Sequence, residues 1–470
     1  YGHSRLGFNL QGPIIKDKKE SSTSLLGFFI SGDANYRKDS RPTANGVWVT
    51  TGDTKNYVEQ TPLIASGVTE GSTVKSAEFM GYPEFEHRKT NLNASRYGLN
   101  LSGKLDLRTS STTNFTLGGQ FNYDDGNVYS FGQTLFNSDK NYLQRNQSWR
   151  VFGRFTQRFA TSSESSSFVK NIYYSLQFDY SQENNRSMDP DHKDDIFKYG
   201  YLGKFTTYKI PSYELVPEIE INGTTYENVV VLNSWDNDTA YTFEAADYNP
   251  LIARYTEQVY ELFPVNWEEG ATTGNWSNSD QLQLRGGILN GKEPDAIYGM
   301  WSVPGSIQTR YGIADNTQMS FNASASADLG NHELKFGFVY DQRIERGYSY
   351  NSSALWTRMR GLTNNHILQL DVDNPQMEFI DQNLIYYYRK YDEISQFTFD
   401  KNLRKKLGLD EKGLDFILVD SYSFDDGTIQ YYDKDGLLHS TKVEGDLYSI
   451  DMFSADELLN NGEYVAYYYG

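Results

Sequence analysis

The sequence predicts an all-β protein, and more narrowly a transmembrane antiparallel β-barrel with long loops on one side of the membrane. Three observations predict this class: apolar and polar residues alternate with a period of two, the connections between the alternating segments differ greatly in length, and charged residues keep to one face of each segment. No run approaches the about 18 apolar residues of a membrane-spanning helix, and the mean hydropathy is −0.64. A membrane-spanning strand needs only about ten residues with every second one apolar, so the composition permits it.

The alternation defines eight half-apolar segments, which we expect to be strands. In one of them, Leu105 and Leu107 alternate with Lys104, Asp106 and Arg108. Every second side chain of such a segment points to a common apolar face. The expected strands cover residues 5–12, 25–36, 96–108, 114–124, 148–159, 171–182, 317–329 and 332–343.

The connections between these segments alternate in length. Short polar links occupy residues 13–24, 109–113, 160–169 and 330–331, and long ones occupy residues 37–95, 125–147, 183–316 and 344–470. A soluble sandwich has turns of similar size at both ends, whereas an outer-membrane barrel has short periplasmic turns and long extracellular loops. The sequence therefore predicts a partial barrel over residues 1–343, with extracellular loops at 37–95, 125–147 and 183–316, and a long, truncated extracellular loop region over 344–470. No signal peptide precedes residue 1, so we expect a piece of a longer protein.

Loops of this length usually carry structure of their own. Residues 250–263 are expected to form a helix with Pro250 at its first position and apolar residues along one face. A capping box at Ser454 predicts a second, short helix that Gly462 would end. Residues 428–439 resemble a hairpin that turns through an Asp-Gly sequence.

The charged face of the strands decides which side can meet lipid. A charge near the middle of a bilayer would cost roughly 2–4 kcal/mol, so we expect the charged face to look into an aqueous lumen and the apolar face to contact acyl chains. The basic residues expected to face the lumen are Lys104, Arg108, Arg150, Arg154, Arg158 and Lys335. An interfacial aromatic girdle is expected from Tyr36, Tyr97, Tyr123, Trp149 and Tyr340. A large soluble sheet with one wet face is the alternative that the alternation leaves open.

Composition and motifs exclude several functional classes. The 470 residues include 62 acidic and 43 basic residues, a net charge of −19, so no basic surface suits a nucleic acid. Cysteine is absent, which excludes disulfides, thiolate metal sites and cysteine nucleophiles. The six histidines show no metal-binding spacing, and neither a serine-hydrolase elbow nor a phosphate-binding loop occurs. We therefore expect no enzymatic activity.

Two groups of loop residues are candidates for binding. Aromatic rings give a large contact area at little conformational cost, which suits capture of a sugar or a peptide, although long loops also need aromatic residues for their own cores. The candidate ligand-binding aromatics are Trp235, Trp267, Trp276, Trp301, Trp356, Tyr387 and Tyr468. Crowded carboxylates could bind Ca²⁺, although Asp-Gly sequences are also ordinary turns. The candidate Ca²⁺ ligands are Asp189, Asp191, Asp433 and Asp435.

Several phrases of the sequence resemble a known family. Residues 4–16 (SRLGFNLQGPIIK) with 26–32 (LGFFISG), residues 331–338 (NHELKFGF) and residues 454–462 (SADELLNNG) are similar to segments of TonB-dependent outer-membrane receptors of Bacteroidetes, of the Oar-like group and more distantly of SusC-like transporters. The resemblance implies a 22-stranded barrel that is occluded by an amino-terminal plug and energised by TonB. Plug, TonB box and aromatic-ended closing strand lie outside this sequence, so the resemblance implies an internal portion of the barrel that begins near the second strand. A closed eight-stranded barrel is a smaller alternative.

The resemblance implies a function at the bacterial outer membrane. Extracellular loops would capture a bulky ligand, and TonB, pulling on the plug, would open a passage through the lumen. The expected partners are outer-membrane lipid, TonB through the plug, a surface lipoprotein and an unidentified imported ligand, with no nucleic acid and no cofactor beyond Ca²⁺ in the acidic loops. Two alternatives remain: a barrel that anchors loops for adhesion or partner docking without transport, and a soluble secreted β-rich binding protein.

Overall fold

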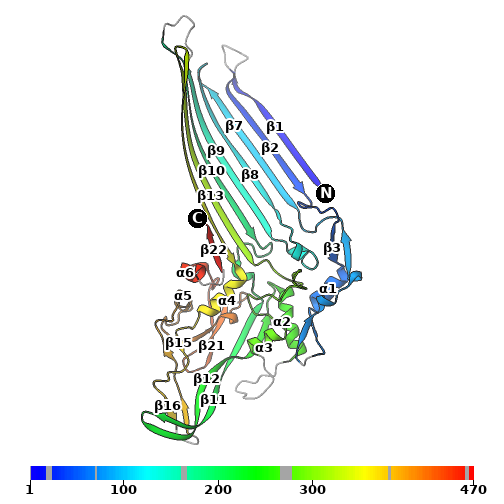
Figure 1. Ribbon diagram of the computed structural model, residues 1–470, viewed down its shortest axis with the longest axis vertical. Coiled ribbons are helices and arrows are strands. Elements are labelled where there is room, and N and C mark those ends of the chain that lie inside the picture. The colour runs from blue at the N-terminus through cyan, green and yellow to red at the C-terminus, as the bar shows by residue number, and fades with distance from the viewer. Residues whose placement is uncertain are drawn as a thin grey trace.

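The computed structural model describes residues 2–16, 24–68, 71–159, 167–264, 278–378, 383–460 and 465–469, apart from the side chains of residues 236–241 and 467–469. The protein is mostly β, as predicted, and its largest element is a nine-stranded antiparallel sheet, which we call the wall (Figure 1). Its strands follow in the order β1 (His3–Lys16), β2 (Ser24–Arg37), β7 (Arg96–Arg108), β8 (Thr113–Asn127), β9 (Leu143–Phe159), β10 (Val169–Met188), β13 (Arg310–Leu329), β14 (His332–Asn351) and β22 (Ala466–Tyr469).

The first eight of these strands lie where the alternation predicts them, but several are longer than expected. β10 continues to Met188 and β13 begins at Arg310, so the bounds expected for the loop 183–316 are wrong at both ends. The division placed after residue 343 is also wrong, because it falls inside β14. The extensions lack the regular apolar alternation, because polar residues such as Asn184 and Asp315 interrupt the outer face before Ile313, yet their backbones remain paired in register. The described strands form an open sheet and do not close into a barrel.

The short connections lie at one end of the wall and the long connections at the other, as the sequence predicts. One end carries only the short links, and the other carries the long connections, which fold together (Figure 1). We call the described parts of residues 38–95, 128–142, 189–309 and 352–465 the loop module. Among the described residues, none of the helices is long and apolar enough to cross a membrane.

The loop module contains short strands and helices. Its strands are β3 (Val47–Thr50), β4 (Leu63–Ala65), β5 (Thr73–Lys75), β6 (Phe85–Arg88), β11 (Gly203–Ile221), β12 (Thr224–Ala245), β15 (Ile367–Leu368), β16 (Gln376–Glu378), β17 (Leu384–Tyr386), β18 (Lys390–Tyr391), β19 (Phe416–Leu418), β20 (Thr428–Tyr432) and β21 (Leu438–Lys442). Its α-helices are α1 (Gly52–Gln60), α2 (Pro250–Leu262), α3 (Ser279–Leu284), α4 (Ser352–Leu362), α5 (Thr398–Leu407) and α6 (Ala455–Leu459). Its 3-10 helices are η1 (Ser76–Phe79), η2 (Tyr82–Glu84), η3 (Phe131–Gln133), η4 (Ser138–Lys140), η5 (Ile196–Lys198), η6 (Val419–Ser421) and η7 (Ile450–Met452).

The loop elements expected from local sequence signals are confirmed. α2 begins with Pro250 at its first turn, and β20 and β21 form the expected hairpin. At α6 the capping box is complete, because the Ser454 hydroxyl accepts from the N–H of Glu457 at 3.3 Å and the Glu457 carboxylate accepts from the N–H of Ser454 at 2.7 Å. Gly462, expected to end this helix, lies outside the described residues.

A long hairpin made of β11 and β12 was expected to be loop and is instead regular structure. It turns at Asn222 and Gly223, whose φ values of 53° and 78° are those of a tight hairpin turn. The hairpin extends away from the wall (Figure 1) and joins β17 and β16 in a four-stranded sheet. Valine, isoleucine and tyrosine from these strands form a small apolar cluster around Val229, Val231 and Ile385.

Most of the buried core of the protein lies in the loop module, and the wall contributes to it only at its loop-module end, through Met188, Tyr311 and Ala466. Its largest cluster surrounds Trp356 and Tyr448, and a second cluster surrounds α2. Large apolar side chains of the wall, such as Phe8 at 57% and Phe336 at 69%, stay exposed. The module is therefore stabilised by its own packing, whereas the wall has an unpartnered apolar face.

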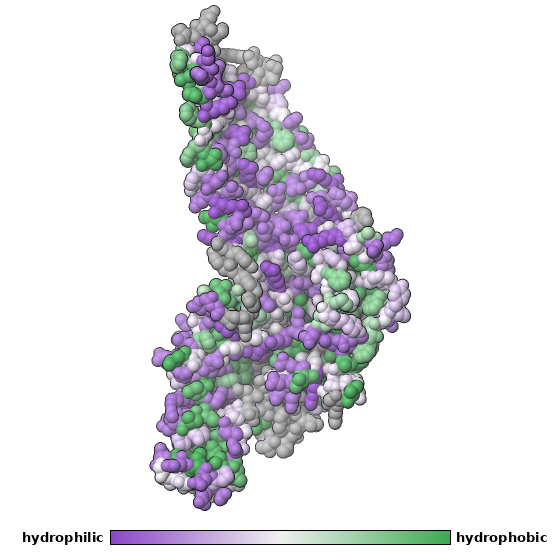
Figure 2. Space-filling model, viewed as in Figure 1, coloured by the Kyte–Doolittle hydropathy of each residue, from purple (hydrophilic) through white to green (hydrophobic). Residues whose placement is uncertain are grey.

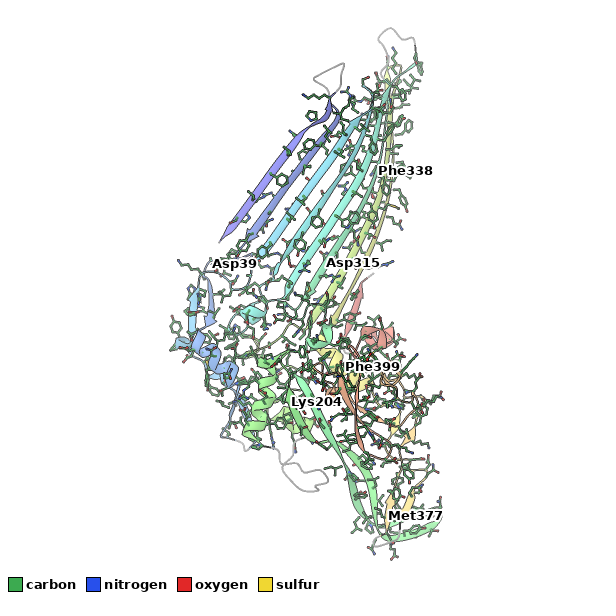
Figure 3. All side chains as sticks on the ribbon, turned by 180° about the vertical axis from the view of Figure 1, so that it is seen from behind. Asp39, Lys204, Asp315, Phe338, Met377 and Phe399 are labelled. Atoms are coloured by element: carbon green, nitrogen blue, oxygen red, sulfur yellow. The ribbon has the colours of Figure 1, made fainter. Side chains whose placement is uncertain are left out.

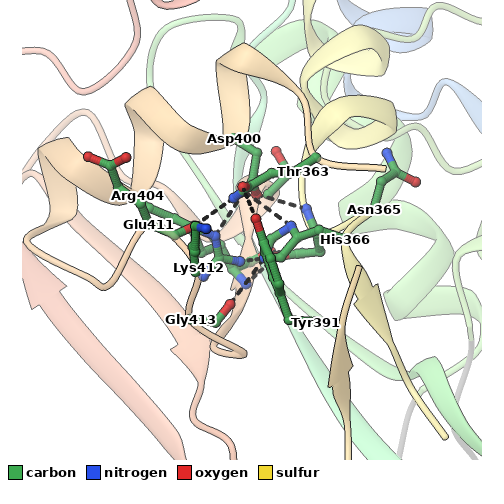
Figure 4. Close-up of polar contacts among 12 residues, drawn as sticks. Thr363, Asn365, His366, Tyr391, Asp400, Arg404, Glu411, Lys412 and Gly413 are labelled. Carbon is green, nitrogen blue, oxygen red and sulfur yellow. Dashed lines mark hydrogen bonds and ion pairs between the residues drawn. The ribbon is translucent and has the colours of Figure 1, made fainter. Parts of the chain in front are cut away.

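A buried polar network joins α4, α5 and the loop that follows (Figure 4). The Arg404 guanidinium donates to the Asp400 carboxylate at 2.9 Å, and neither side chain is exposed. Asp400 also accepts from the N–H of Asn364 at 3.0 Å, and Arg404 donates to the carbonyl of Asp415 at 2.7 Å. His366 places its Nδ1 3.3 Å from Asp400. Each charge of the pair is thus compensated only by the other and by fixed polar groups.

Replacing one member of this pair should destabilise the loop module strongly. Arg404→Met leaves the Asp400 carboxylate buried without its counter-charge, which typically costs about 3–5 kcal/mol. Near-ultraviolet circular dichroism during chemical unfolding reports on the aromatic core and measures the loss. The double variant Asp400→Leu/Arg404→Met is the control and should recover most of it. Equal losses in the single and double variants would contradict an energetic role for the pair.

His366 should make the loop module sensitive to mild acid. Burial disfavours the imidazolium and lowers the pKa of His366, against the attraction of Asp400. The unfolded chain then binds more protons below the ordinary value of about 6.5, so the stability that His366 contributes above that pH is lost as the pH falls. Between pH 7.5 and 5.5 the native protein should lose more stability than His366→Phe, measured by the same unfolding titration. A larger loss in the variant would reverse the assigned sign.

Candidate functional site

The wall has one continuous apolar face. In-register pairing aligns its side chains in rows across the strands, one of which contains Phe28, Leu105, Leu117, Gly153, Phe178, Phe321 and Tyr340. These rows are exposed, with Leu117 at 49% and Phe178 at 46%. Figure 3 shows Phe338 of the same face projecting from the wall. An apolar surface of this extent, without a partner in the protein, is typical of a contact with lipid or with another chain.

Four of the five aromatic residues expected to form a girdle, Tyr36, Tyr97, Tyr123 and Trp149, lie toward the loop-module end of this face, whereas Tyr340 lies in the row of Leu117 and Phe178. The rings of Tyr36 and Tyr97 are 5.1 Å apart on neighbouring strands, and those of Trp149 and Tyr180 are 5.4 Å apart. Beyond them the same face turns polar, for example at Asn184 and Asp315, which are paired across β10 and β13. The apolar face therefore ends in an aromatic border on the side of the long loops.

The opposite face of the wall is polar and carries all six basic residues expected to face a lumen. Figure 2 shows mainly hydrophilic residues over the strands in this view. The face is not predominantly basic, however, because acidic side chains pair with many of its cations. The ion pairs are Arg5–Asp33, Arg96–Asp124, Lys104–Asp106, Arg150–Asp179, Lys335–Glu333 and Arg343–Glu345.

The remaining basic residues that were expected on this face do not pair with carboxylates in the described part of the protein. Arg154 donates to Gln177 at 2.6 Å, and the guanidinium of Arg158 lies 5.6 Å from the ring centre of Tyr173. Arg108 ends β7 on the same face. The expected common face is therefore present, and carboxylates within the face neutralise three of its six expected cations, Lys104, Arg150 and Lys335.

A cavity of about 760 Å³ lies on the polar face where the wall meets the loop module, and we call it the junction pocket. Its floor consists of positions with little or no side chain, Gly312, Ala314 and Gly347, on β13 and β14. Gly312 pairs with Ser187 and Ser349 on the two neighbouring strands. Three adjacent strands thus leave an open space that polar groups surround.

Some polar residues of the junction pocket have hydrogen-bond or ion-pair partners among the described residues, and others do not. Glu345 holds Arg343 at 2.5 Å, and Asn185 donates to Glu183 at 3.0 Å. Within the described part of the chain, the guanidinium of Arg310 makes no hydrogen bond or ion pair. The sequence analysis missed this residue, although continuing the alternation of residues 317–329 backwards would have placed it on the polar face. The junction pocket therefore contains a cation that is available to a ligand.

The candidate aromatics do not assemble into one binding surface. Trp356 is fully buried and donates from Nε1 to the carbonyl of Phe197 at 2.9 Å, so its expected contact with a ligand is wrong and it is a core residue. Trp301 and Tyr387 are partly buried against two different clusters. Trp235 lies 5.9 Å from the guanidinium of Arg389. Trp267 and Trp276 lie outside the described residues, as does the side chain of Tyr468, whose backbone pairs with Tyr348.

Other large apolar residues of the loop module, most of them aromatic, are exposed where three of its connections meet. The exposed side chains are Trp48, Phe79, Tyr82, Phe131, Tyr298 and Met300. The three connections are joined by the N–H of Ser302 donating to Gly132 at 2.8 Å, by Thr50 donating to Leu135 and by Tyr298 donating to Glu78. Sequence alone did not reveal this surface, because it depends on which distant connections come together.

The candidate calcium ligands are occupied by their own turns. One oxygen of Asp189 accepts from the N–H groups of Asp191 and His192 at 2.8 and 3.0 Å, and Asp191 pairs with Lys140. Asp433 similarly accepts from the N–H of Asp435 at 2.9 Å. Among the residues that the structure describes, no group of three metal-binding side chains could hold an ion. In this structure Asp189 and Asp433 therefore stabilise turns, and Ca²⁺ binding at the four residues stays a prediction.

No protein-family model matches this chain, and no curated protein matches it. The functional conclusion must therefore come from the two faces of the wall, the loop module and the junction pocket.

Trp356 provides a test of the assignment of buried aromatics to the core. Trp356→Ala removes a fully buried side chain and should destabilise the loop module by about 3–5 kcal/mol, measured by chemical unfolding. Trp48→Ala is the matched control, because Trp48 is 41% exposed, and should cost about 1 kcal/mol or less. Similar losses in the two variants would contradict the assignment.

Proposed function

We propose that this chain forms part of the barrel and extracellular loops of a TonB-dependent receptor and transporter in a bacterial outer membrane. The observation that carries the proposal is the wall itself: one registered face is apolar and exposed, and the opposite face is polar and ion-paired. Acyl chains would cover the first face, and an aqueous lumen would bathe the second. Outer-membrane lipid is thus the first partner.

The length of the strands supports a wall that continues beyond the bilayer. β10, β13 and β14 have 20 residues each, or roughly 65 Å at the usual rise, whereas a tilted strand needs only about ten residues to cross the hydrocarbon. Their apolar alternation fails toward the loop module, where Asn184 and Asp315 appear on the outer face. This end would project outside the cell and carry the loop module.

The open sheet supports a larger barrel. In lipid an unpaired strand edge leaves backbone N–H and C=O groups without partners, so the edges at β1 and along β14 would require further strands. A total of 22 strands, a plug inside them and TonB acting on that plug follow from the sequence resemblance alone. The loops would capture a bulky ligand, together with a surface lipoprotein, and the polar face would guide it through the lumen.

Two other functions are consistent with parts of this architecture. A barrel that only anchors the loop module for adhesion would have the same wall. A soluble secreted binding protein would need another surface to cover the apolar face. Growth on defined nutrients after deletion of the gene separates transport from adhesion, because only a transporter should leave a nutrient unused.

Leu117→Arg tests the membrane assignment. This residue lies in the middle of the apolar face, where a charge should cost roughly 2–4 kcal/mol and reduce the folded, membrane-inserted form seen by heat-modifiable electrophoresis of outer membranes. Gln120→Arg is the matched control, because the same strand turns it to the polar face. Equal insertion of both variants, or recovery of the native protein without detergent, would overturn the proposal.

A further inference from the structure

We propose that the junction pocket selects ligands that carry a carboxylate and binds that group with Arg310. The inference deepens the proposed function, on which it rests for the position of the pocket at the outer mouth of the lumen. Among the described residues, Arg310 lines this pocket from the polar face without a counter-charge.

Arg310 stands out in a chain with an excess of acid. The protein has 62 acidic and 43 basic residues, and the ion pairs of the polar face show that carboxylates readily occupy its cations. Even Glu345, which lines the same pocket, pairs with Arg343 and not with Arg310. An arginine fork matches a carboxylate in a bidentate geometry, and such charge-assisted hydrogen bonds are stronger than neutral ones.

The floor of the junction pocket leaves room for the rest of the ligand. Gly312, Ala314 and Gly347 contribute almost no side chain on the paired strands β13 and β14, and Ser187 and Ser349 are the cross-strand partners of Gly312. Asn316 adds a side-chain amide on the same face of β13, two residues beyond Ala314. Hydroxyl and amide groups suit a ligand whose body is itself polar, such as a peptide or a sugar chain.

The charges around the pocket favour a carboxylate over a phosphate. Glu345 lines the pocket, and Glu183 pairs with Asn316 across β10 and β13. A dianionic phosphate would be repelled by these acids more strongly than a singly charged carboxylate. A carboxylate can come from an acidic peptide or from an acidic sugar, and both sources present the same group to Arg310.

Binding to the full chain in detergent micelles tests the inference by isothermal titration. The acidic probes are acetyl-Gly-Glu-Gly-amide and a disaccharide that contains glucuronic acid, and their neutral counterparts contain Gln and glucose. At least one acidic probe should bind roughly tenfold or more tightly than its neutral counterpart, and the preferred probe identifies the source. Arg310→Gln should abolish this advantage, because a hydrogen bond to a charged group is lost.

Two further variants make the test specific. Gly312→Leu should block binding by filling the floor, and it should leave the fold intact because a Cβ at this position would meet its nearest atom at 3.6 Å, an ordinary contact. Arg254→Gln removes an arginine that pairs with Glu261 on α2, and it should bind like the native protein. Wild-type binding by Arg310→Gln, equal binding of acidic and neutral probes, or preference for phosphoserine peptide would each overturn the inference. Insertion of Leu117→Arg tests the barrel separately, so the two failures are distinguishable.

Discussion

Backbone pairing in the wall determines which side each side chain faces, because the side-chain period of a strand is two and a slip by one residue would exchange the faces. The register is fixed by packing as well as by hydrogen bonds. At Gly32 a Cβ would lie 2.7 Å from both Phe8 and Leu101, so the neighbouring strands approach over a position that has no side chain. The apolar rows, the ion pairs and the junction pocket all depend on this register.

The loop module and the wall are stabilised in different ways. The loop module packs its own aromatic core and compensates its buried charges internally, as at Asp400 and Arg404. The wall has no such core, and its large apolar residues need an external partner. The junction pocket lies between these parts. Gln308, which lines it, donates to the carbonyl of Lys140 at 2.9 Å, so the folded module sets one side of a site whose floor belongs to the wall.

The strands were predictable because alternation is a local signal, whereas the loop module depends on contacts between distant residues. Asn222 and Gly223 carry a strong hairpin signal, and Ile219 and Ile221 alternate with glutamates before it, so this hairpin was also open to prediction. The burial of Trp356 could not be read from sequence, since its partner carbonyl belongs to Phe197, far along the chain. Alternation places Arg310 on the polar face, but its lack of a counter-charge follows from the pairing of Glu345 with Arg343.

The position of the junction pocket also follows from the physics of the wall. Where a strand faces lipid, its outer residues must be apolar, and the inner face can vary only within that limit. Toward the loop module, polar residues such as Asn184 and Asp315 interrupt the outer face of β10 and β13, so in the proposed barrel this part of the wall would be released from the constraint. In the proposed barrel, the small residues Ser187, Gly312 and Ser349 could be aligned on three strands without loss of membrane contact, and Arg310 could stay unpaired because water would reach it. A ligand site would therefore be least costly to build just beyond the aromatic border, where the junction pocket lies.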